Sequence, residues 1–596
     1  MDRRAFLTSS ALLAGTSLLP AQLLAQPGSG DAAANALFEQ LFNEAVARSP
    51  ELATSLGLDQ GPLASLKSQL SPRTAEERQK DLALTRRALA RLRALNGLSS
   101  ANELNRDVLV YSLEGQEVAP ARFGIDSVVR PYPIFQQGGA YFSMPDFLNS
   151  AHTIKTSADA EAYLARLEAF SRVLDEEAAE QRAQAARGFL APAWSLDLTL
   201  VQMRKLRSAA PDQSGMVQSL VTRAKSANVA GDWAARATRI VDDKVYPALD
   251  RQIAAIEALR PSTRPGDGVW RLPQGDAIYA AALEQMTTTT MSPDEVHRMG
   301  LAQVAEISAE LDKILRTEGL TRGSVGARLA QLNARPDQVY PDTADGRAAL
   351  IESLNDDVRR MNAQLPRFFA TLPDQPLEIR AVPVEIQDGA SNGYYRRASL
   401  DGSRPAIYFI NLKDVRDWPK YTLPALSFHE GTPGHHLQIS IAQTSKDIPM
   451  LRKLGGFSAY SEGWALYAES VADEAKVYRT PLERAGFLQS YLFRATRLVV
   501  DTGLHDKRWT REKATDYMVE TTGFARPRTQ REVERYCTQA GQACSYKVGH
   551  GVWQRLRAEA ERQPGFDVKQ FHEVLKEGAM PLTILERRVR ERMKSA

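Results

Sequence analysis

Helical periodicity constrains the fold of this chain more than any other feature of its sequence. Apolar residues recur at three- and four-residue spacing, with charged residues on the opposite face, in the long segments 74–95, 158–186 and 292–315. The third segment begins with Ser-Pro-Asp-Glu at 292–295, which combines a capping serine, a proline at the first helical position and a glutamate three residues after the cap. The sequence therefore predicts a mainly α protein.

Strand-like sequence is scarce. The stretches 377–387 and 405–412 are rich in β-branched and aromatic residues, and a polar segment with Gly and Ser separates them. We expect them to form a small antiparallel β-sheet just before residue 427, with an exposed edge that can pair with an extended peptide.

A region dense in Pro and Gly divides the chain at 261–275. Such composition is typical of a junction between structural units. We expect an N-terminal helical half over 26–260 and a C-terminal helical half over 276–596, which carries the chemistry-bearing motifs described below.

Residues 1–25 have the pattern of an export signal. Arg3 and Arg4 precede an apolar run of small residues, and a plausible cleavage point follows Ala25. The paired arginines resemble a twin-arginine signal. A membrane anchor is disfavoured, because the run is shorter than the ~20 residues of a spanning helix and Pro20 interrupts it. No cysteine directly follows the run, so the sequence does not predict a lipid anchor at that point. The sequence therefore predicts a periplasmic protein with no stable membrane span in its mature form.

Charge and cysteine content are less informative. Lys and Arg number 75 against 72 Asp and Glu, and no basic stripe is interleaved with aromatic residues, which argues against nucleic acid as a partner. Cys537 and Cys544 are compatible with either a local disulfide or two buried thiols. The oligomeric state is left open.

Three of the eight histidines lie together in SFHEGTPGHHLQ, where His429, His435 and His436 accompany Glu430. Zinc binds imidazole nitrogen and carboxylate oxygen, and a catalytic zinc site keeps one position for water. A zinc peptidase usually carries its second histidine four residues after the first, but Pro433 stands there. The cluster predicts a zinc site with a remodelled motif.

Helix geometry shows why a break is needed between the histidines. In an unbroken helix His436 would lie ~10.5 Å along the axis from His429, and His435 would point about 120° away from it. Pro433 and Gly434 can supply a kink. If they are a two-residue insertion, His435 is the second ligand; His436 remains the alternative.

Further along the chain, FSAYSEGWALYAESVADE offers a third ligand on a predicted helix. Glu462 is the candidate, with exposed surface as its alternative. Glu469 lies two turns later on nearly the same face, where we expect it to pair with a cation or support a metal ligand. Glu430, adjacent to the first histidine, has the chemistry of a general base.

The motifs HEGTPGHHLQ, SEGWALYAE, RATRLVVDTGLH and ERYCTQAGQACSYKVG resemble, in that order, a large bacterial family known as domain-of-unknown-function family 885. The resemblance covers most of the mature chain and is strongest over 376–555. That family is similar to gluzincin metallopeptidases, whose third ligand is a glutamate on a later helix. The resemblance implies a large helical, metallopeptidase-like bowl, with His429, His435 and Glu462 as metal ligands and Glu430 as general base.

An oxyanion that develops during amide hydrolysis needs a hydrogen-bond donor besides the metal. Tyr546, His505 and Tyr536 are candidates, each with a structural role as the alternative. His505 and Tyr546 lie in stretches that resemble the family.

Two arginines precede His505 in RATRLVVDTGLH. The spacing of Arg497 and Asp501 predicts an ion pair within one helix. The alternative is that one of the arginines, Arg494 or Arg497, or Arg535 further on, clamps the C-terminal carboxylate of a peptide; for Arg535 both roles stay open.

Together, these features predict an exported, zinc-dependent peptidase that hydrolyses short peptides within a deep helical cleft. Two alternatives remain. One is a metal-dependent amidase or deacylase acting on a non-peptide amide. The other is a periplasmic binding protein without catalysis, which the presence of Glu430 beside the metal ligands disfavours.

Overall fold

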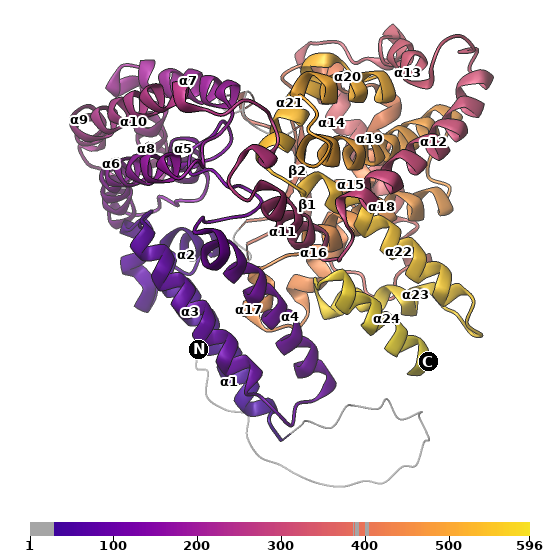
Figure 1. Ribbon diagram of the computed structural model, residues 1–596, viewed down its shortest axis with the longest axis horizontal. Helices are drawn as coiled ribbons and strands as arrows, with labels where there is room; N and C mark the ends of the chain where they lie inside the picture. Colours follow the sequence, from indigo (N-terminus) through magenta and orange to yellow (C-terminus); the bar gives the residue numbers. More distant parts are fainter. Residues whose placement is uncertain (1–28, 385–386, 388–391, 400–403, 596) are drawn as a thin grey trace.

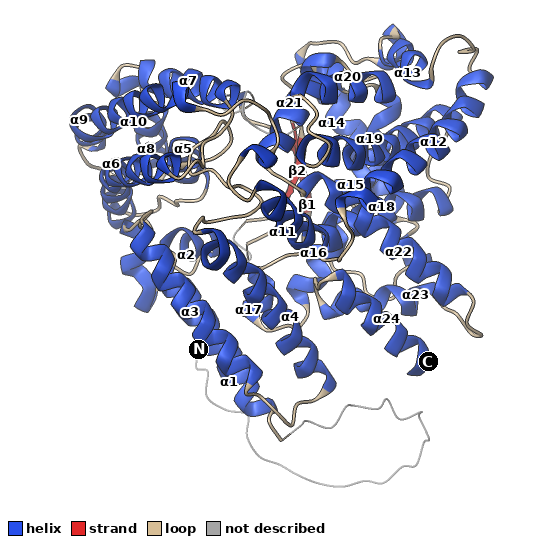
Figure 2. Ribbon diagram, viewed as in Figure 1, coloured by secondary structure: helices blue, strands red, loops and turns tan. Residues whose placement is uncertain are grey.

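The computed structural model describes residues 29–384, 387, 392–399 and 404–595. Helices dominate these residues, so the predicted mainly α class is confirmed (Figure 2). The predicted export signal, 1–25, lies outside the described residues. Over the part of the chain that the structure describes, each helix is either too short or too polar to span a bilayer.

The N-terminal part of the chain consists of two neighbouring groups of helices (Figure 1). The later group packs around the 30-residue helix α6, which begins with a capping box between Thr156 and Asp159. In the earlier group, α1 and α4 also contact the short helix α17 of the C-terminal part. The helices are α1 (Asp31–Arg48), α2 (Pro50–Leu56), α3 (Ala75–Arg93), α4 (Ser100–Val118), α5 (Ala140–Ser150), α6 (Ser157–Ala186), α7 (Ala193–Ser208), α8 (Gly215–Ser226), α9 (Trp233–Ile240) and α10 (Tyr246–Leu259).

The C-terminal part is built around two pairs of packed helices. Helix α12 packs against α19, and α18 packs against α22. The predicted capping box of Ser292 and Glu295 is present at the start of α12. The helices are α11 (Gly275–Thr287), α12 (Pro293–Thr317), α13 (Val325–Asn333), α14 (Ala344–Asn362), α15 (Leu423–Glu430), α16 (His435–Thr444), α17 (Met450–Leu454), α18 (Ser458–Glu474), α19 (Pro481–His505), α20 (Arg511–Thr522), α21 (Arg526–Thr538), α22 (Ser545–Glu561), α23 (Val568–His572) and α24 (Leu582–Ser595).

A three-stranded sheet precedes α15, and its topology corrects the antiparallel prediction. Strand β1 (Leu377–Ala381) pairs parallel with β3 (Ala406–Ile410), whereas β2 (Gly393–Arg396) pairs antiparallel with β3. The strand order is β1-β3-β2. The physical reason is that β2, in the polar segment we expected to be only a connection, reverses the chain once more. The two predicted strands therefore run in the same direction, and β2 forms one edge of the sheet.

The region 261–275 contains only two short 3₁₀ turns, Arg260–Ser262 and Val269–Arg271, before α11 begins. The large apolar cluster of the N-terminal part takes all of its buried members from 70–282 except Ala540. The domain boundary itself stays a prediction.

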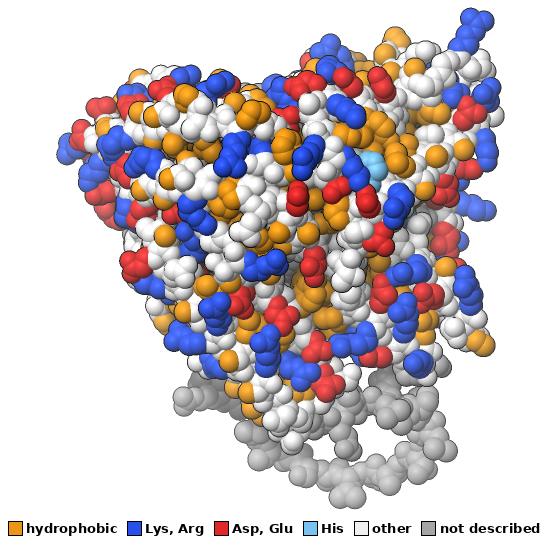
Figure 3. All heavy atoms as spheres, viewed as in Figure 1, with side chains coloured by type: hydrophobic (Ala, Val, Ile, Leu, Met, Phe, Trp, Pro, Cys, Tyr) orange, Lys and Arg blue, Asp and Glu red, His pale blue; other side chains and the backbone are white. Residues whose placement is uncertain are grey.

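The surface carries both charge signs, in keeping with the formal net charge of +3. Basic and acidic side chains are interspersed over the face in Figure 3.

Candidate metal centre

The helix is interrupted between the first two histidines of the motif, His429 and His435. Helix α15 ends at Glu430 and α16 begins at His435. The Thr432–Pro433 peptide bond between them is cis. At Gly434 a Cβ atom would lie 1.9 Å from the backbone oxygen of His429, so only glycine lets the start of α16 approach the end of α15 this closely.

This break brings His429 and His435 together with Glu462 of α18. One donor atom from each residue lies within 4.8 Å of the other two. The Glu462 Oε2 atom is 3.4 Å from His429 Nε2 and 3.3 Å from His435 Nε2. Donors at ~2.0–2.1 Å from a tetrahedral zinc are separated by about 3.3 Å. The three predicted ligands therefore have the donor types and the spacing of a zinc site.

The centre is buried and acidic. His429 is 2% exposed, and its Nδ1 atom lies 2.9 Å from Oε1 of Glu469, which is 0% exposed. Burial alone would lower the pKa of His429, but the Glu462 and Glu469 carboxylates raise it to about 9. Glu462 Oε2 is buried and has no hydrogen-bond partner among the residues that the structure describes. An orphaned carboxylate oxygen facing two imidazoles suits a bound cation.

Glu469 thus occupies the supporting position that the sequence suggested. A carboxylate on the second nitrogen of a metal-binding histidine fixes the orientation and tautomer of the ring.

The alternative ligand His436 points elsewhere. Its Nδ1 atom lies 3.3 Å from the Tyr395 hydroxyl and its Nε2 atom 2.9 Å from the Gln375 backbone oxygen. Because both ring nitrogens have partners outside the triad, the geometry favours His435 over His436.

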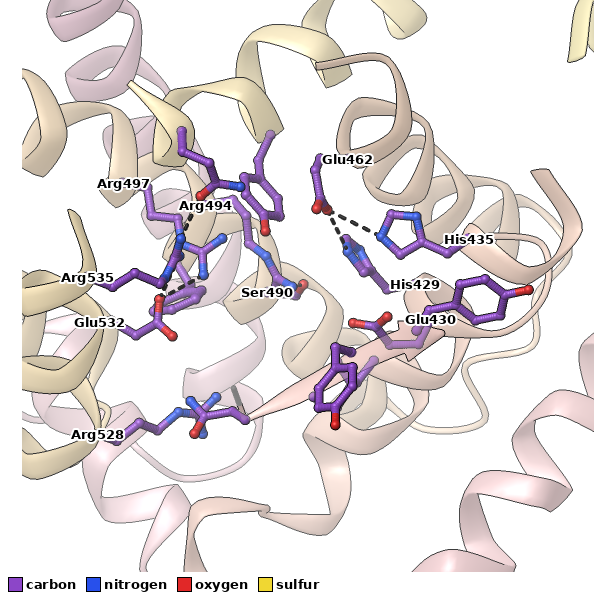
Figure 4. A pocket seen from close by; sticks show the side chains of 18 of the residues that line it. His429, Glu430, His435, Glu462, Ser490, Arg494, Arg497, Arg528, Glu532 and Arg535 are labelled. Atoms are coloured by element: carbon purple, nitrogen blue, oxygen red, sulfur yellow. Dashed lines mark hydrogen bonds and ion pairs between the residues drawn. The ribbon is translucent and has the colours of Figure 1, made fainter. Parts of the chain in front are cut away.

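A cavity of about 930 Å³ opens beside the triad. Glu430 and Tyr546 line it, as do all four residues of strand β2, Gly393–Arg396. Figure 4 shows the Glu430 carboxylate pointing into this cavity next to His429. The Tyr546 ring stacks beside the His429 ring, with centroids 6.4 Å apart. Helices α19 and α21 and residues 130–146 of the N-terminal part complete the walls.

His505 does not line this cavity, and its surroundings favour the structural role left open for it over the catalytic one. It is fully buried; its Nδ1 atom accepts a hydrogen bond from the Val269 amide, and its Nε2 atom faces the Tyr536 backbone oxygen at 3.0 Å. Both nitrogens therefore serve the packing of α19. Tyr536 is also buried, and its hydroxyl donates to Glu532.

The predicted pair of Arg497 and Asp501 is wrong. Arg497 instead contacts Glu532 of α21 at 3.0 Å. Asp501 accepts hydrogen bonds from the Tyr279 hydroxyl and the Gly541 amide. Arg497 and Asp501 thus each interact with residues outside α19 rather than with one another.

Two further residues of the cavity, Arg528 and Glu532, were missed by sequence reasoning. The only signal for them is the density of charged residues in RPRTQREVERY. Cys537 and Cys544 carry free, buried thiols, so the structure shows the second of the two alternatives left open for them.

The fold and the site define a mainly α protein with a candidate His-His-Glu metal centre. The chain belongs to the family described as bacterial protein of unknown function (DUF885), whose model matches residues 50–589.

The solved structures that are similar to this chain include two candidate lipoproteins. The crystal structure of a candidate lipoprotein from Colwellia psychrerythraea has 32% sequence identity and a TM-score of 0.91, covering 95% of this chain and 100% of its own. A candidate lipoprotein of unknown function from Shewanella oneidensis has 17% identity and a TM-score of 0.71, with 94% and 99% covered, and shows a shared fold alone. No curated protein matches the chain.

Proposed function

We propose that this protein is a zinc-dependent peptidase that hydrolyses short peptides. The observation that carries the proposal is the convergence of His429, His435 and Glu462 on the wall of a large cavity. Two imidazoles and one carboxylate leave a position for water in a four-coordinate zinc site, which is the arrangement of catalytic rather than structural zinc.

We assign separate roles in hydrolysis to the metal ligands, to Glu430 and to Tyr546. His429, His435 and Glu462 would hold the zinc ion, which when bound would lower the pKa of a water towards ~7 and polarise a carbonyl group. Glu430 accepts the proton of the attacking water and delivers it to the leaving amine. Tyr546 is the donor that we assign to the developing oxyanion, because it lines the cavity beside His429.

Strand β2 supports a peptide as the substrate. It is an edge strand of the sheet formed by the described residues, and its residues Gly393–Arg396 all line the cavity. An extended peptide can pair with the free edge of such a strand and present a backbone carbonyl to the metal.

We also infer that the protein works in the periplasm. The paired arginines of the N-terminal sequence support export by the twin-arginine route. The similar structure from Colwellia psychrerythraea belongs to a candidate lipoprotein, and this supports a location in the cell envelope.

The test is a Glu430→Gln variant assayed with zinc analysis and a panel of peptides and non-peptide amides. We expect one zinc per chain in both proteins and a loss of about 10²–10⁴ in kcat for the variant, because only the proton acceptor is removed. A wild-type protein without stoichiometric zinc, or a variant as active as wild type, would refute the proposal. Cleavage of the non-peptide amides alone would favour an amidase.

A further inference from the structure

The cavity wall beside the metal centre is rich in arginine. Figure 4 shows Arg497 and Arg535 beside Glu532, across the cavity from the triad. We call five of the arginines that line the cavity the arginine cluster: Arg130, Arg494, Arg497, Arg528 and Arg535.

The arginine cluster has far fewer acidic partners than charges. Among the described residues, Glu532 is the only acid within ion-pair distance of any member, and it contacts Arg497 and Arg535 at 3.0 and 3.1 Å. Its Oε2 atom also accepts the hydroxyl of Tyr536 at 2.8 Å. One shared carboxylate cannot neutralise five guanidinium groups, so the wall keeps an excess of positive charge, which is costly without a counter-ion.

Several guanidinium N–H groups in the cluster lack a partner within the described part of the chain. Arg497 is 5% exposed, and its Nη1 atom is buried with no hydrogen bond to any described residue. The Nε atoms of Arg494 and Arg528 are likewise buried and unpaired. Arg494 donates to the Ser490 hydroxyl and Arg528 to the Asp417 backbone oxygen, so neither has a charged acceptor among the described residues. Unpaired guanidinium donors suit the planar, two-oxygen geometry of a carboxylate.

The cluster lies a short distance from the metal ligands. The Arg497 guanidinium carbon is 4.4 Å from the centroid of the Tyr546 ring, and the His429 ring centroid is 6.4 Å from the same point. The Arg497 guanidinium carbon and the His429 ring centroid are therefore at most about 11 Å apart. That distance is the length of about three extended residues at ~3.5 Å each. Part of this span is taken up by the contacts at each end, so one or two residues fit between a bond at the metal and a carboxylate at the cluster.

We propose that the arginine cluster binds the C-terminal carboxylate of the substrate, so that the protein releases one or two residues from the C-terminus of a peptide. The proposal rests on the proposed peptidase function and specifies its substrate class. The water oxygen bonds to the scissile carbonyl carbon as the C–N bond breaks. Glu430 transfers the water proton to the amine of the released amino acid or dipeptide, whose carboxylate is held by Arg494, Arg497 and Arg528.

The first test compares a tetrapeptide with a free C-terminal carboxylate and the same peptide as a C-terminal amide. We expect kcat/KM to be at least tenfold higher for the acid, with mass spectrometry locating the cut one or two bonds from the C-terminus. Arg494→Gln should reduce this preference for the acid at least fivefold. Arg494 is preferred to Arg497 because Arg497 also holds Glu532.

Arg484→Gln is the matched control. Arg484 lies on the same helix, α19, but it is 45% exposed and contacts Asp473 outside the cavity. The control should keep the preference of the wild type. Equal rates for acid and amide, or cuts distributed along longer peptides, would overturn the proposal while leaving peptidase activity in place.

A second test does not depend on turnover. Calorimetry of the metal-free Glu430→Gln variant with the same two peptides should show at least tenfold tighter binding of the acid, and adding Arg494→Gln should abolish the difference. If no peptide is cleaved but this difference is found, the carboxylate site stands and the proposed reaction fails. If peptides are cleaved and the two ligands bind equally, the reaction stands and the carboxylate site is refuted.

Discussion

The pairing of Glu469 with His429 gives a sharp test of the metal centre. Glu469→Gln keeps the size of the side chain and an oxygen that can accept from His429 Nδ1, but it removes the negative charge. In the native protein the two atoms are 2.9 Å apart, and the side chains are 0% and 2% exposed, so water cannot replace the lost interaction.

A buried hydrogen bond to a charged group contributes about 1.5–3 kcal/mol, and a neutral acceptor retains part of it. We therefore expect the variant to lose about 1.4–2 kcal/mol of zinc-binding free energy, which is a 10- to 30-fold weaker affinity. Competition with a chromophoric chelator measures the dissociation constant for zinc. The melting temperature of the metal-free proteins shows whether the variant is folded.

Glu474→Gln is the matched control, because Glu474 lies on the same helix, α18, with its side chain 49% exposed beside Arg557. Its zinc affinity should equal that of the wild type. A Glu469→Gln variant that is folded and binds zinc within twofold of the wild type would refute the supporting role of Glu469.

Three further predictions concern the ligand choice, the helix break and a distant carboxyl. His435→Ala should abolish stoichiometric zinc binding, whereas His436→Ala should retain it, as measured by metal analysis after dialysis; the reverse result would exchange the two ligands. Gly434→Ala should lower the free energy of unfolding by about 1–3 kcal/mol and weaken zinc binding, because its Cβ would meet a backbone oxygen at 1.9 Å; denaturant titration with unchanged values would contradict the close approach. Burial raises the pKa of Glu177 from 4.5 to about 7, so the folded state retains a proton that the unfolded state loses, and stability should fall by up to about 3 kcal/mol between pH 4.5 and 7. Glu177→Gln should remove this fall when the free energy of unfolding is measured as a function of pH. A variant whose free energy of unfolding depends on pH as steeply as that of the wild type would contradict the assignment to Glu177.

The sequence by itself determined the helical class and the residue types of the candidate metal donors. The segments 74–95, 158–186 and 292–315 match α3, α6 and α12 closely, because amphipathic periodicity and helix caps are local properties of the chain. His435 and Glu462 were predictable from residue chemistry and from the resemblance to a family.

Only the tertiary structure decided which partners the remaining polar residues meet. Arg497 contacts Glu532 rather than Asp501, and His505 is enclosed by Val269 and Tyr536. These partners come from elements that are distant in the sequence, and helical spacing cannot reveal them. The direction of β1 relative to β3 was hidden for the same reason, since it depends on an intervening strand.

The break between α15 and α16 lies between these two cases. The sequence showed that Pro433 and Gly434 interrupt the helix, but the direction of the chain after the break depends on the close approach of Gly434 to the His429 backbone oxygen. That contact turns His435 towards Glu462 and leaves His436 to the Gln375 backbone. Local sequence could provide the break, whereas packing placed His435 rather than His436 beside Glu462, because that placement depends on distances between atoms of different elements.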